Sequence, residues 1–117
     1  MALEDVDILD NIGIDKESGH VVLSIIDNLD WNNECQHLSL LQDKLNYYLG
    51  FIESNEIYVA YPKSKGREFE IFIYARYSVP EGGIQFLNKV KSLLVQSGYF
   101  FRVEEWIPEL GSWKSIF

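Results

Sequence analysis

The stretch from Glu34 to Ser54, ECQHLSLLQDKLNYYLGFIES, constrains the fold more than any other part of the chain. Its aliphatic residues recur at spacings of three and four, which is the period of one face of a helix. They are Leu38, Leu41, Leu45, Leu49 and Ile52. We therefore predict one long amphipathic helix here, with the rest of the domain packed around it.

The same predicted helix carries a second apolar group, set away from the leucine stripe. It comprises Leu40, Tyr47 and Phe51. On a helical wheel, only His37 and Lys44 lie between the two groups. Because a surface helix usually carries one apolar stripe, two stripes indicate two packing partners. The leucines would pack on a sheet, and the second group would be covered either by the C-terminal tail of the same chain or by another chain.

Length and composition favour one globular domain. The chain has 117 residues, of which 47% are hydrophobic, enough for a single core. We expect the core to span about residues 6–105, followed by an aromatic tail, residues 106–117. No apolar run is long enough to span a bilayer, and the acidic N-terminus does not resemble a signal peptide. The single cysteine, Cys35, excludes an intrachain disulfide. We therefore expect a cytoplasmic protein.

The charge balance bears on possible partners. Eighteen acidic residues outnumber ten basic ones, which gives a net charge of −8. Binding to nucleic acid requires clustered Lys and Arg, and the basic residues here are scattered. We therefore predict no nucleic-acid partner. The acidity fits either solubility alone or a basic protein partner that is attracted electrostatically.

The remaining apolar runs predict strands and a second helix. The predicted strands are Val6–Ile14, His20–Ile26, Ile57–Tyr61, Glu68–Tyr77 and Tyr99–Glu105, and the helix runs from about Pro80 to Ser97. The polar stretch DKESG between the first two runs indicates a hairpin. Gly82 and Gly83 weaken the start of the second helix, and they lack the flanking pattern of a phosphate-binding loop.

The run Glu68–Tyr77 is the clearest strand. Its odd-numbered residues form a wholly apolar face, whereas the even-numbered face mixes Phe72 and Tyr74 with charged residues. The sheet should therefore have one core face and one face that is at least partly solvated.

The element order predicts an α+β fold of type ββαββαβ. We expect an antiparallel sheet of four or five strands with two helices on one face. Without its first strand, the pattern is βαββαβ, the ferredoxin-like split βαβ arrangement.

No catalytic or metal-binding constellation emerges. Cys35 lies at the start of the long helix, but His37, two residues on, points away from it. One cysteine and two histidines are too few for a zinc site. Asp27, Asp30 and Glu34 could serve as hard-metal ligands, but helix capping and the helix dipole explain them equally well. We predict no metal, no cofactor and no catalytic residue.

Several phrases occur in a familiar succession. They are VDILDNIGIDKESGHVVLSIIDNLDW, HLSLLQDKLNYYLGFIES, YPKSKGREFEIFIYARY and the later SGYFF. This succession resembles a family of small bacterial domains of unknown function, over roughly Val6 to Glu104. The resemblance implies a bacterial, cytoplasmic, single-domain protein. It supplies no activity and no catalytic residues.

The leading functional hypothesis is a non-enzymatic protein-interaction module that forms a homodimer or binds another protein. Its motives are the second helical stripe, the mixed sheet face and the aromatic tail, since aromatic residues often anchor interfaces. The interface candidates are Leu40, Tyr47, Phe51, Phe72, Tyr74, Trp106, Trp113 and Phe117.

Two alternatives remain at this point. One is an immunity-like protein that neutralises a basic toxin, in keeping with the small size and acidity. The other is a small-molecule-binding or catalytic domain with a pocket between the sheet and the loop 27–34. The candidates for that pocket are His20, Asp27, Asp30, Trp31 and His37.

Overall fold

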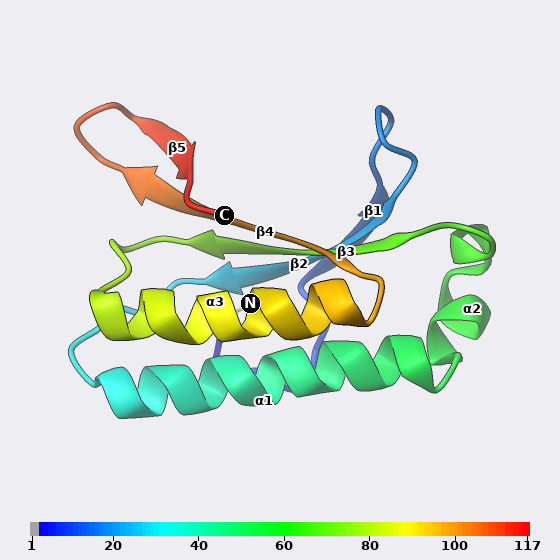
Figure 1. Cartoon of the computed structure of the whole chain (residues 1–117), viewed down its shortest axis with the longest axis horizontal. Helices are drawn as coiled ribbons and strands as arrows, with labels where there is room; N and C mark the ends of the chain where they lie inside the picture. The colour runs from blue at the N-terminus through cyan, green and yellow to red at the C-terminus, as the bar shows by residue number, and fades with distance from the viewer. Residues whose placement is uncertain (1–2) are drawn as a thin grey trace.

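A computed structural model describes residues 3–117 and shows an α+β fold (Figure 1). Within these residues the chain forms five strands, three α-helices and one 3-10 turn. In chain order they are β1 (Asn11–Ile14), β2 (Val21–Asp27), α1 (Glu34–Glu53), α2 (Glu56–Ala60), η1 (Pro62–Ser64), β3 (Phe69–Ala75), α3 (Glu81–Gln96), β4 (Phe100–Ile107) and β5 (Ser112–Ser115). The long helix, the second helix and the first hairpin therefore lie where the sequence predicts them.

The five strands form one mixed sheet in the order β1-β2-β3-β4-β5. The three central strands are parallel, with Val21 opposite Phe69 and Ile73 opposite Val103. The outer strands are antiparallel to their neighbours, so that β1 pairs with β2 and β5 pairs with β4. The prediction of an antiparallel, ferredoxin-like sheet is therefore wrong.

The error arises at the segment 57–61. This segment was predicted as a strand, but residues 56–60 form α2 and the chain continues into η1. Only one strand, β3, then lies between α1 and α3. A strand that returns after a helical crossover runs parallel to the strand before it. The fifth strand comes instead from the C-terminal tail, as β5.

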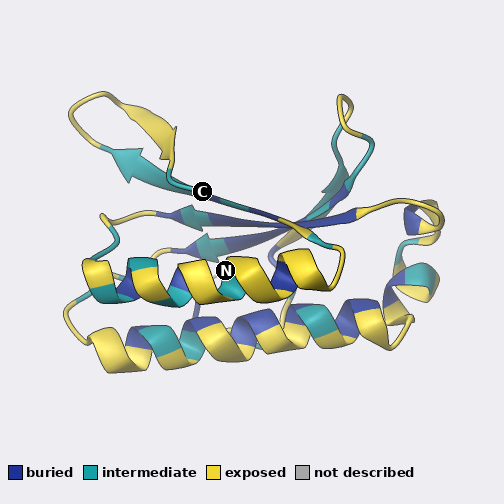
Figure 2. Cartoon of the chain, viewed as in Figure 1, coloured by how far each residue is buried: buried dark blue, intermediate teal, exposed yellow. Residues whose placement is uncertain are grey.

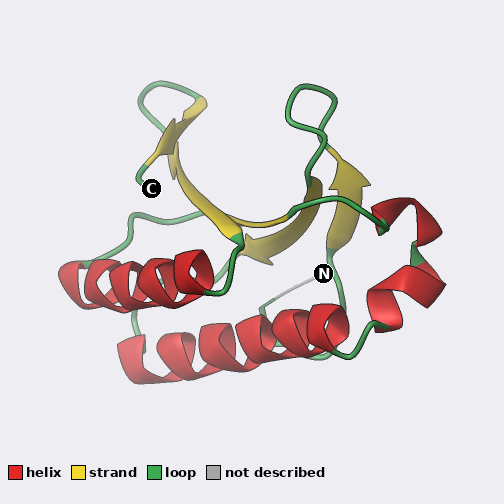
Figure 3. Ribbon diagram, turned by 45° about the vertical axis from the view of Figure 1, so that its right-hand side comes forward, coloured by secondary structure: helices red, strands yellow, loops and turns green. Residues whose placement is uncertain are grey.

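Both long helices lie on the same face of the sheet, as predicted (Figure 1). Two crossovers of the same hand that advance in the same direction along a sheet place their helices on one face. The ends of the sheet, with the β1–β2 and β4–β5 hairpins, bend away from the helices (Figure 3). The face without helices is therefore concave and open.

The core lies between the helix layer and the sheet (Figure 2). The strands contribute Val21, Leu23, Ile25, Phe69, Ile71, Ile73, Phe101 and Val103. The helices contribute Leu41, Leu45, Tyr48, Ile52, Leu87 and Leu94. The apolar face predicted for Glu68–Tyr77 is thus the core face as far as Ala75, whereas Tyr77 lies beyond the strand and is 48% exposed.

The two apolar stripes of α1 form one broad packed face. The residues between the stripes, His37 and Lys44, are themselves buried, and each is paired with an aspartate. Phe51 belongs to the core and Leu40 packs against it, while Tyr47 is 37% exposed. A buried charge is tolerated where an opposite charge and hydrogen bonds compensate it, which is why polar residues lie within this face.

The C-terminal tail packs on its own chain. The backbone N–H groups of Ile116 and Phe117 donate to the carbonyl of Val103, and the ring of Phe117 lies 6.3 Å from that of Phe101. Lys91 of α3 lies over the same ring of Phe117. The tail therefore docks on β4 and α3, and the interpretation that it covers Leu40, Tyr47 and Phe51 is wrong.

Candidate functional site

Four aromatic rings from three strands lie in contact on the open face of the sheet. The rings of Phe72 and Tyr74 are stacked, with centroids 4.2 Å apart. Trp113 of β5 makes edge contacts at 5.3 Å with both Tyr74 and Trp106. Parallel pairing of β3 with β4 and antiparallel pairing of β4 with β5 bring these residues together.

An arginine lies at each end of this row of rings. The guanidinium of Arg102 lies 4.1 Å from the centre of the Phe72 ring, and that of Arg76 lies 5.3 Å from the centre of the Trp106 ring. Both distances allow a cation–π attraction. We call Phe72, Tyr74, Trp106 and Trp113, together with Arg76 and Arg102, the aromatic array.

The array contains half of the residues predicted as an interface from the sequence. The other four lie elsewhere: Leu40, Tyr47 and Phe51 are on α1, and Phe117 packs against Phe101 of the core. Periodicity predicted which face of a helix or strand each of these apolar residues lies on. Only the pairing of the strands shows which of them come into contact. Arg76 and Arg102 were not among the predicted interface residues. Arg76 continues the even-numbered face of β3, and Arg102 of β4 lies opposite Phe72.

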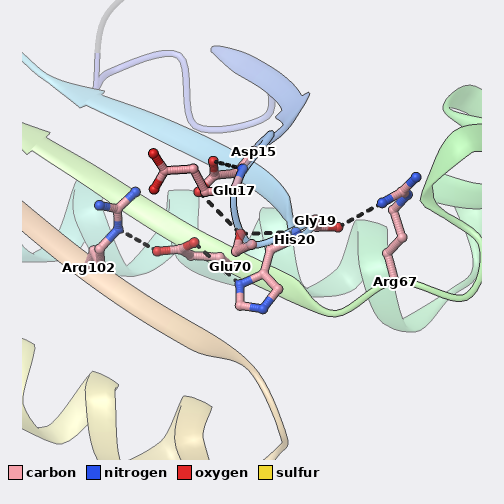
Figure 4. Close-up of polar contacts among 8 residues, drawn as sticks. Asp15, Glu17, Gly19, His20, Arg67, Glu70 and Arg102 are labelled. Carbon is pink, nitrogen blue, oxygen red and sulfur yellow. Dashed lines mark hydrogen bonds and ion pairs between the residues drawn. The ribbon is translucent and has the colours of Figure 1, made fainter.

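Glu70 holds one end of the array in place (Figure 4). Its carboxylate is buried on the open face and accepts a hydrogen bond from Nε of Arg102 at 2.5 Å. Its other oxygen lies 3.7 Å from Nδ1 of His20, whose ring stacks on Phe100. The Arg102 guanidinium is thus fixed over Phe72, and the nearby charges largely compensate one another.

The β1–β2 loop borders this end of the open face (Figure 4). The carboxylate of Asp15 accepts hydrogen bonds from the backbone N–H of Glu17 and the hydroxyl of Ser18. The Glu17 N–H is the main cause that lowers the pKa of Asp15. A shallow polar depression of about 300 Å³ lies between this loop and the array, lined in part by Asn11, Asp15 and Arg102.

A larger pocket, of about 490 Å³, lies at the other end of the open face. It is lined by Ile26, Asp27, Asn28, Tyr74, Arg76, Tyr77 and Trp113. These residues come from the carboxyl ends of β2 and β3 and from β5. The pocket therefore shares Tyr74, Arg76 and Trp113 with the aromatic array.

Four of the five predicted pocket residues do meet, but they form a closed contact. Nε2 of His37 lies 2.6 Å from a carboxylate oxygen of Asp27, and Nδ1 lies 2.9 Å from the backbone carbonyl of Asp30. The ring of Trp31 stacks on His37 at 3.5 Å. Since both ring nitrogens are occupied and His37 is 1% exposed, this group joins the loop to α1. His20, the fifth candidate, lies apart on the open face.

The charge state of His37 follows from these contacts. Burial lowers the pKa of the His37 imidazole, but the hydrogen bond and the charge of Asp27, with the carbonyl of Asp30, outweigh it. The pKa of His37 is therefore raised above its ordinary value. The Nδ1 atom faces a carbonyl, which only accepts, so that nitrogen carries a proton in either charge state.

A second buried polar group joins Asp10, just before β1, to α1 and β2. Nζ of Lys44 lies 2.8 Å from one carboxylate oxygen of Asp10, whose second oxygen accepts from the N–H of Ile26. The hydroxyl of Tyr48 donates to the carbonyl of Ser24 and accepts from the N–H of Asp10. The predicted strand Val6–Ile14 is wrong for its first five residues, because β1 begins at Asn11 and Asp10 lies buried just before it. The position of Lys44 between two apolar stripes was the available signal.

Neither buried group is accessible to a ligand, and both join segments distant in the sequence. Among residues 3–117, no three His, Cys, Asp or Glu side chains are grouped so as to hold a metal ion. Within the same residues, no helix is both long and apolar enough to cross a membrane. The open face and its pocket are therefore the surfaces of interest.

Comparison with known proteins identifies a family without a known activity. No curated protein and no solved structure matches the chain significantly. Residues 1–106 match the sequence model of a family described as "Family of unknown function (DUF6572)", which agrees with the resemblance noted in the sequence. Because this match covers most of the 117 residues, the chain belongs to the DUF6572 family of unknown function.

Proposed function

We propose that the protein is a non-enzymatic protein-interaction module whose docking surface is the open, concave face of the sheet. The observation that carries this proposal is the aromatic array, a continuous row of four rings and two guanidinium groups on a face that no helix covers. Phe72 is buried next to Arg102, but the row reaches solvent at Trp113, and an aromatic row that ends on an uncovered sheet face favours a role in recognition.

The composition of the array supports this proposal. Tyrosine, tryptophan and arginine are the residue types most enriched among those that dominate binding energy in protein interfaces. The rings also brace one another, and Glu70 fixes Arg102, so little conformational entropy would be lost on binding. Trp113 remains 40% exposed and Phe100, at the opposite end of the face, is 46% exposed.

The experiment is affinity capture on the immobilised full chain, from an extract of the organism that carries the gene. We compare the wild type with Tyr74→Ala and Trp113→Ala, and use Tyr47→Ala on α1 as the matched control. We expect a discrete protein that is retained by the wild type and by the control but lost by both array variants. The proposal would be contradicted if both array variants retained the captured protein as well as the wild type does. It would also be contradicted if the Tyr47→Ala control lost the protein to the same extent.

Self-association is tested on the same variants by light scattering. If the partner is a second copy, the wild type and Tyr47→Ala should have the mass of a dimer, and Trp113→Ala that of a monomer. Unfolding curves of each variant show whether it remains folded.

The net charge of −8 favours a basic protein as the partner. This is the observation behind the immunity-like alternative, in which the partner is a basic toxin. The immunity-like alternative makes a separate prediction: the captured protein should inhibit growth when produced alone, and co-production of this chain should restore growth. A harmless or acidic partner would reject the alternative and leave the interaction module in place.

A further inference from the structure

The pocket of about 490 Å³ is lined by Arg76, and the side-chain hydrogen bonds of arginines within residues 3–117 come from Arg67 and Arg102 instead. Among residues 3–117, no carboxylate lies within ion-pair distance of the Arg76 guanidinium. Its side chain is nevertheless positioned, because it lies over the rings of Trp106 and Tyr77 at 5.3 and 6.0 Å. Its backbone is fixed too, since the N–H of Arg76 donates to the carbonyl of Asp27. A guanidinium held in this way presents a planar set of donors to a carboxylate.

The charge of the pocket is not cancelled by its own acid. Asp27 is the single acidic residue in the lining. Its carboxylate is 2.6 Å from Nε2 of His37 and also accepts from the N–H of Leu29, so it is already engaged on the helix side of the sheet. Arg76 is thus the single basic residue in the lining and faces no unpaired acid within the pocket, although on its other side it lines a neighbouring depression with Glu105 and Glu109.

The walls of the pocket are largely aromatic. Tyr74, Tyr77 and Trp113 provide three rings, and Ile26 adds an aliphatic side chain. The amide of Asn28 is partly committed, because its Oδ1 accepts from the N–H of Leu3. The volume lies within the range of small-molecule pockets.

We infer that this pocket binds an aromatic carboxylate, with its ring against Tyr74, Tyr77 and Trp113 and its carboxylate on Arg76. Two sources share this chemistry: a free aromatic acid, and the C-terminal aromatic residue of a partner protein. The inference goes beyond the proposed docking function, because it requires binding to the purified chain with no partner protein present. Failure of one proposal therefore does not entail failure of the other.

The test is an NMR titration of the full chain that follows the indole N–H of Trp113. The probes are phenylacetate for the free acid, and acetyl-Gly-Gly-Phe with a free carboxyl terminus for the peptide source. Phenylacetamide and acetate are the matched controls, which lack the charge and the ring respectively. We expect saturable shifts with the two aromatic carboxylates, and binding at least about tenfold weaker for both controls, because each lacks one of the two contacts.

Two variants connect the binding to the pocket. Arg76→Gln should weaken phenylacetate at least about tenfold, since it removes the charge-assisted pair. Arg67→Gln changes an arginine at the opposite end of the strands, which donates to the carbonyls of Lys63 and Gly19, and should leave binding unchanged. Tighter binding of the peptide than of phenylacetate would support a partner's C-terminus, and the reverse order a free acid.

Several results would overturn the inference. They are the absence of a saturable shift up to the solubility limit of either probe, equal binding of phenylacetamide, and equal binding of acetate. Equal losses in Arg76→Gln and Arg67→Gln would also overturn it, because the effect would then reflect total charge rather than the pocket.

Discussion

Tyr47 and Tyr48 are neighbours on α1 but differ completely in their surroundings. The hydroxyl of Tyr48 is buried and satisfies two backbone groups, the carbonyl of Ser24 and the N–H of Asp10. Burial is the main cause that raises the pKa of the Tyr48 phenol, so the group stays protonated and can donate. Tyr47 is 37% exposed at the surface of the same helix.

We predict that Tyr48→Phe lowers the free energy of unfolding by about 1–3 kcal/mol, because two buried backbone groups lose their partner. The matched control, Tyr47→Phe, should change it by less than about 0.5 kcal/mol. Urea denaturation of both variants measures the difference. Equal effects of the two substitutions would show that the Tyr48 hydroxyl is not a structural connection.

Gly82 and Gly83 form a second contrast between adjacent residues, in the first turn of α3. A Cβ at Gly83 would lie 2.6 Å from Val79 Cγ1 and 3.1 Å from the Trp31 ring, both of which are packed. A Cβ at Gly82 would meet only the carboxylate of Glu34, an exposed side chain that can move. Close packing therefore requires the glycine at position 83 but not at 82.

We predict that alanine substitutions at these two positions have different effects on the free energy of unfolding. Gly83→Ala should lower the free energy of unfolding by about 1–3 kcal/mol through overpacking. Gly82→Ala should leave it unchanged or raise it by up to about 1 kcal/mol, since alanine favours a helix over glycine. Thermal and urea unfolding of both variants and of the wild type measure these changes. A stabilised Gly83→Ala protein would mean that Trp31 and Val79 have room to move.

At the scale of elements, the connection from β2 to α1 depends on one titrating contact. His37 on α1 holds Asp27, the last residue of β2, and the carbonyl of Asp30 in the loop. The pKa of His37 is raised above its ordinary value, so the contact stabilises the fold fully below about pH 6.5, the value in the unfolded chain. This contribution is lost as the pH rises through the folded pKa.

We predict that the free energy of unfolding falls as the pH is raised above about 6.5. In Asp27→Asn the slope should flatten or reverse, because burial alone lowers the pKa of His37. Urea denaturation at a series of pH values compares the two proteins. A wild type whose stability rises over this range, or two parallel curves, would refute the assignment.

The elements whose packing shows in one periodic pattern were predictable. The strand around Phe69–Ala75 and the helix from Glu34 were found because period 2 and period 3–4 are local signals. Residues 57–61 were assigned incorrectly because five β-prone residues also fit a short helix, and tertiary packing decides between them. The predicted direction of the later strands depends on that assignment. One local error therefore made the predicted sheet antiparallel instead of mixed.

The candidate site was only half predictable for the same reason. The sequence shows that Phe72, Tyr74, Trp106 and Trp113 are aromatic residues near polar ones. Their contact requires the register of β3 against β4 and of β4 against β5, which is not a local property. The buried pairs of His37 with Asp27 and Lys44 with Asp10 were hidden because charged residues are expected on surfaces, and only partners 10 and 34 residues away account for their burial.

At the scale of the whole molecule, the asymmetry of the fold accounts for where function is placed. Both long helices cover one face of the sheet, while the hairpins extend from the other and enclose a concave surface (Figure 3). The central strands β2, β3 and β4 each have a neighbour on both sides, and both neighbours of β3 are parallel to it, whereas within residues 3–117 β1 and β5 each pair with one strand. The array thus rests on a rigid base, but Trp113 stands on an edge strand of four residues.

This arrangement predicts a gradient of local stability that hydrogen exchange can measure. Amides of β3 should exchange only through global unfolding, and those of β5 should exchange at least about tenfold faster through local opening, because β5 is short, exposed and paired on one side. The measurement is made on the full chain at two protein concentrations. If β5 is as protected as β3 at high concentration and loses this protection on dilution, a second copy covers its edge. Equal protection at both concentrations would contradict the predicted gradient, since the edge strand would then be as stable as the centre of the sheet without any partner.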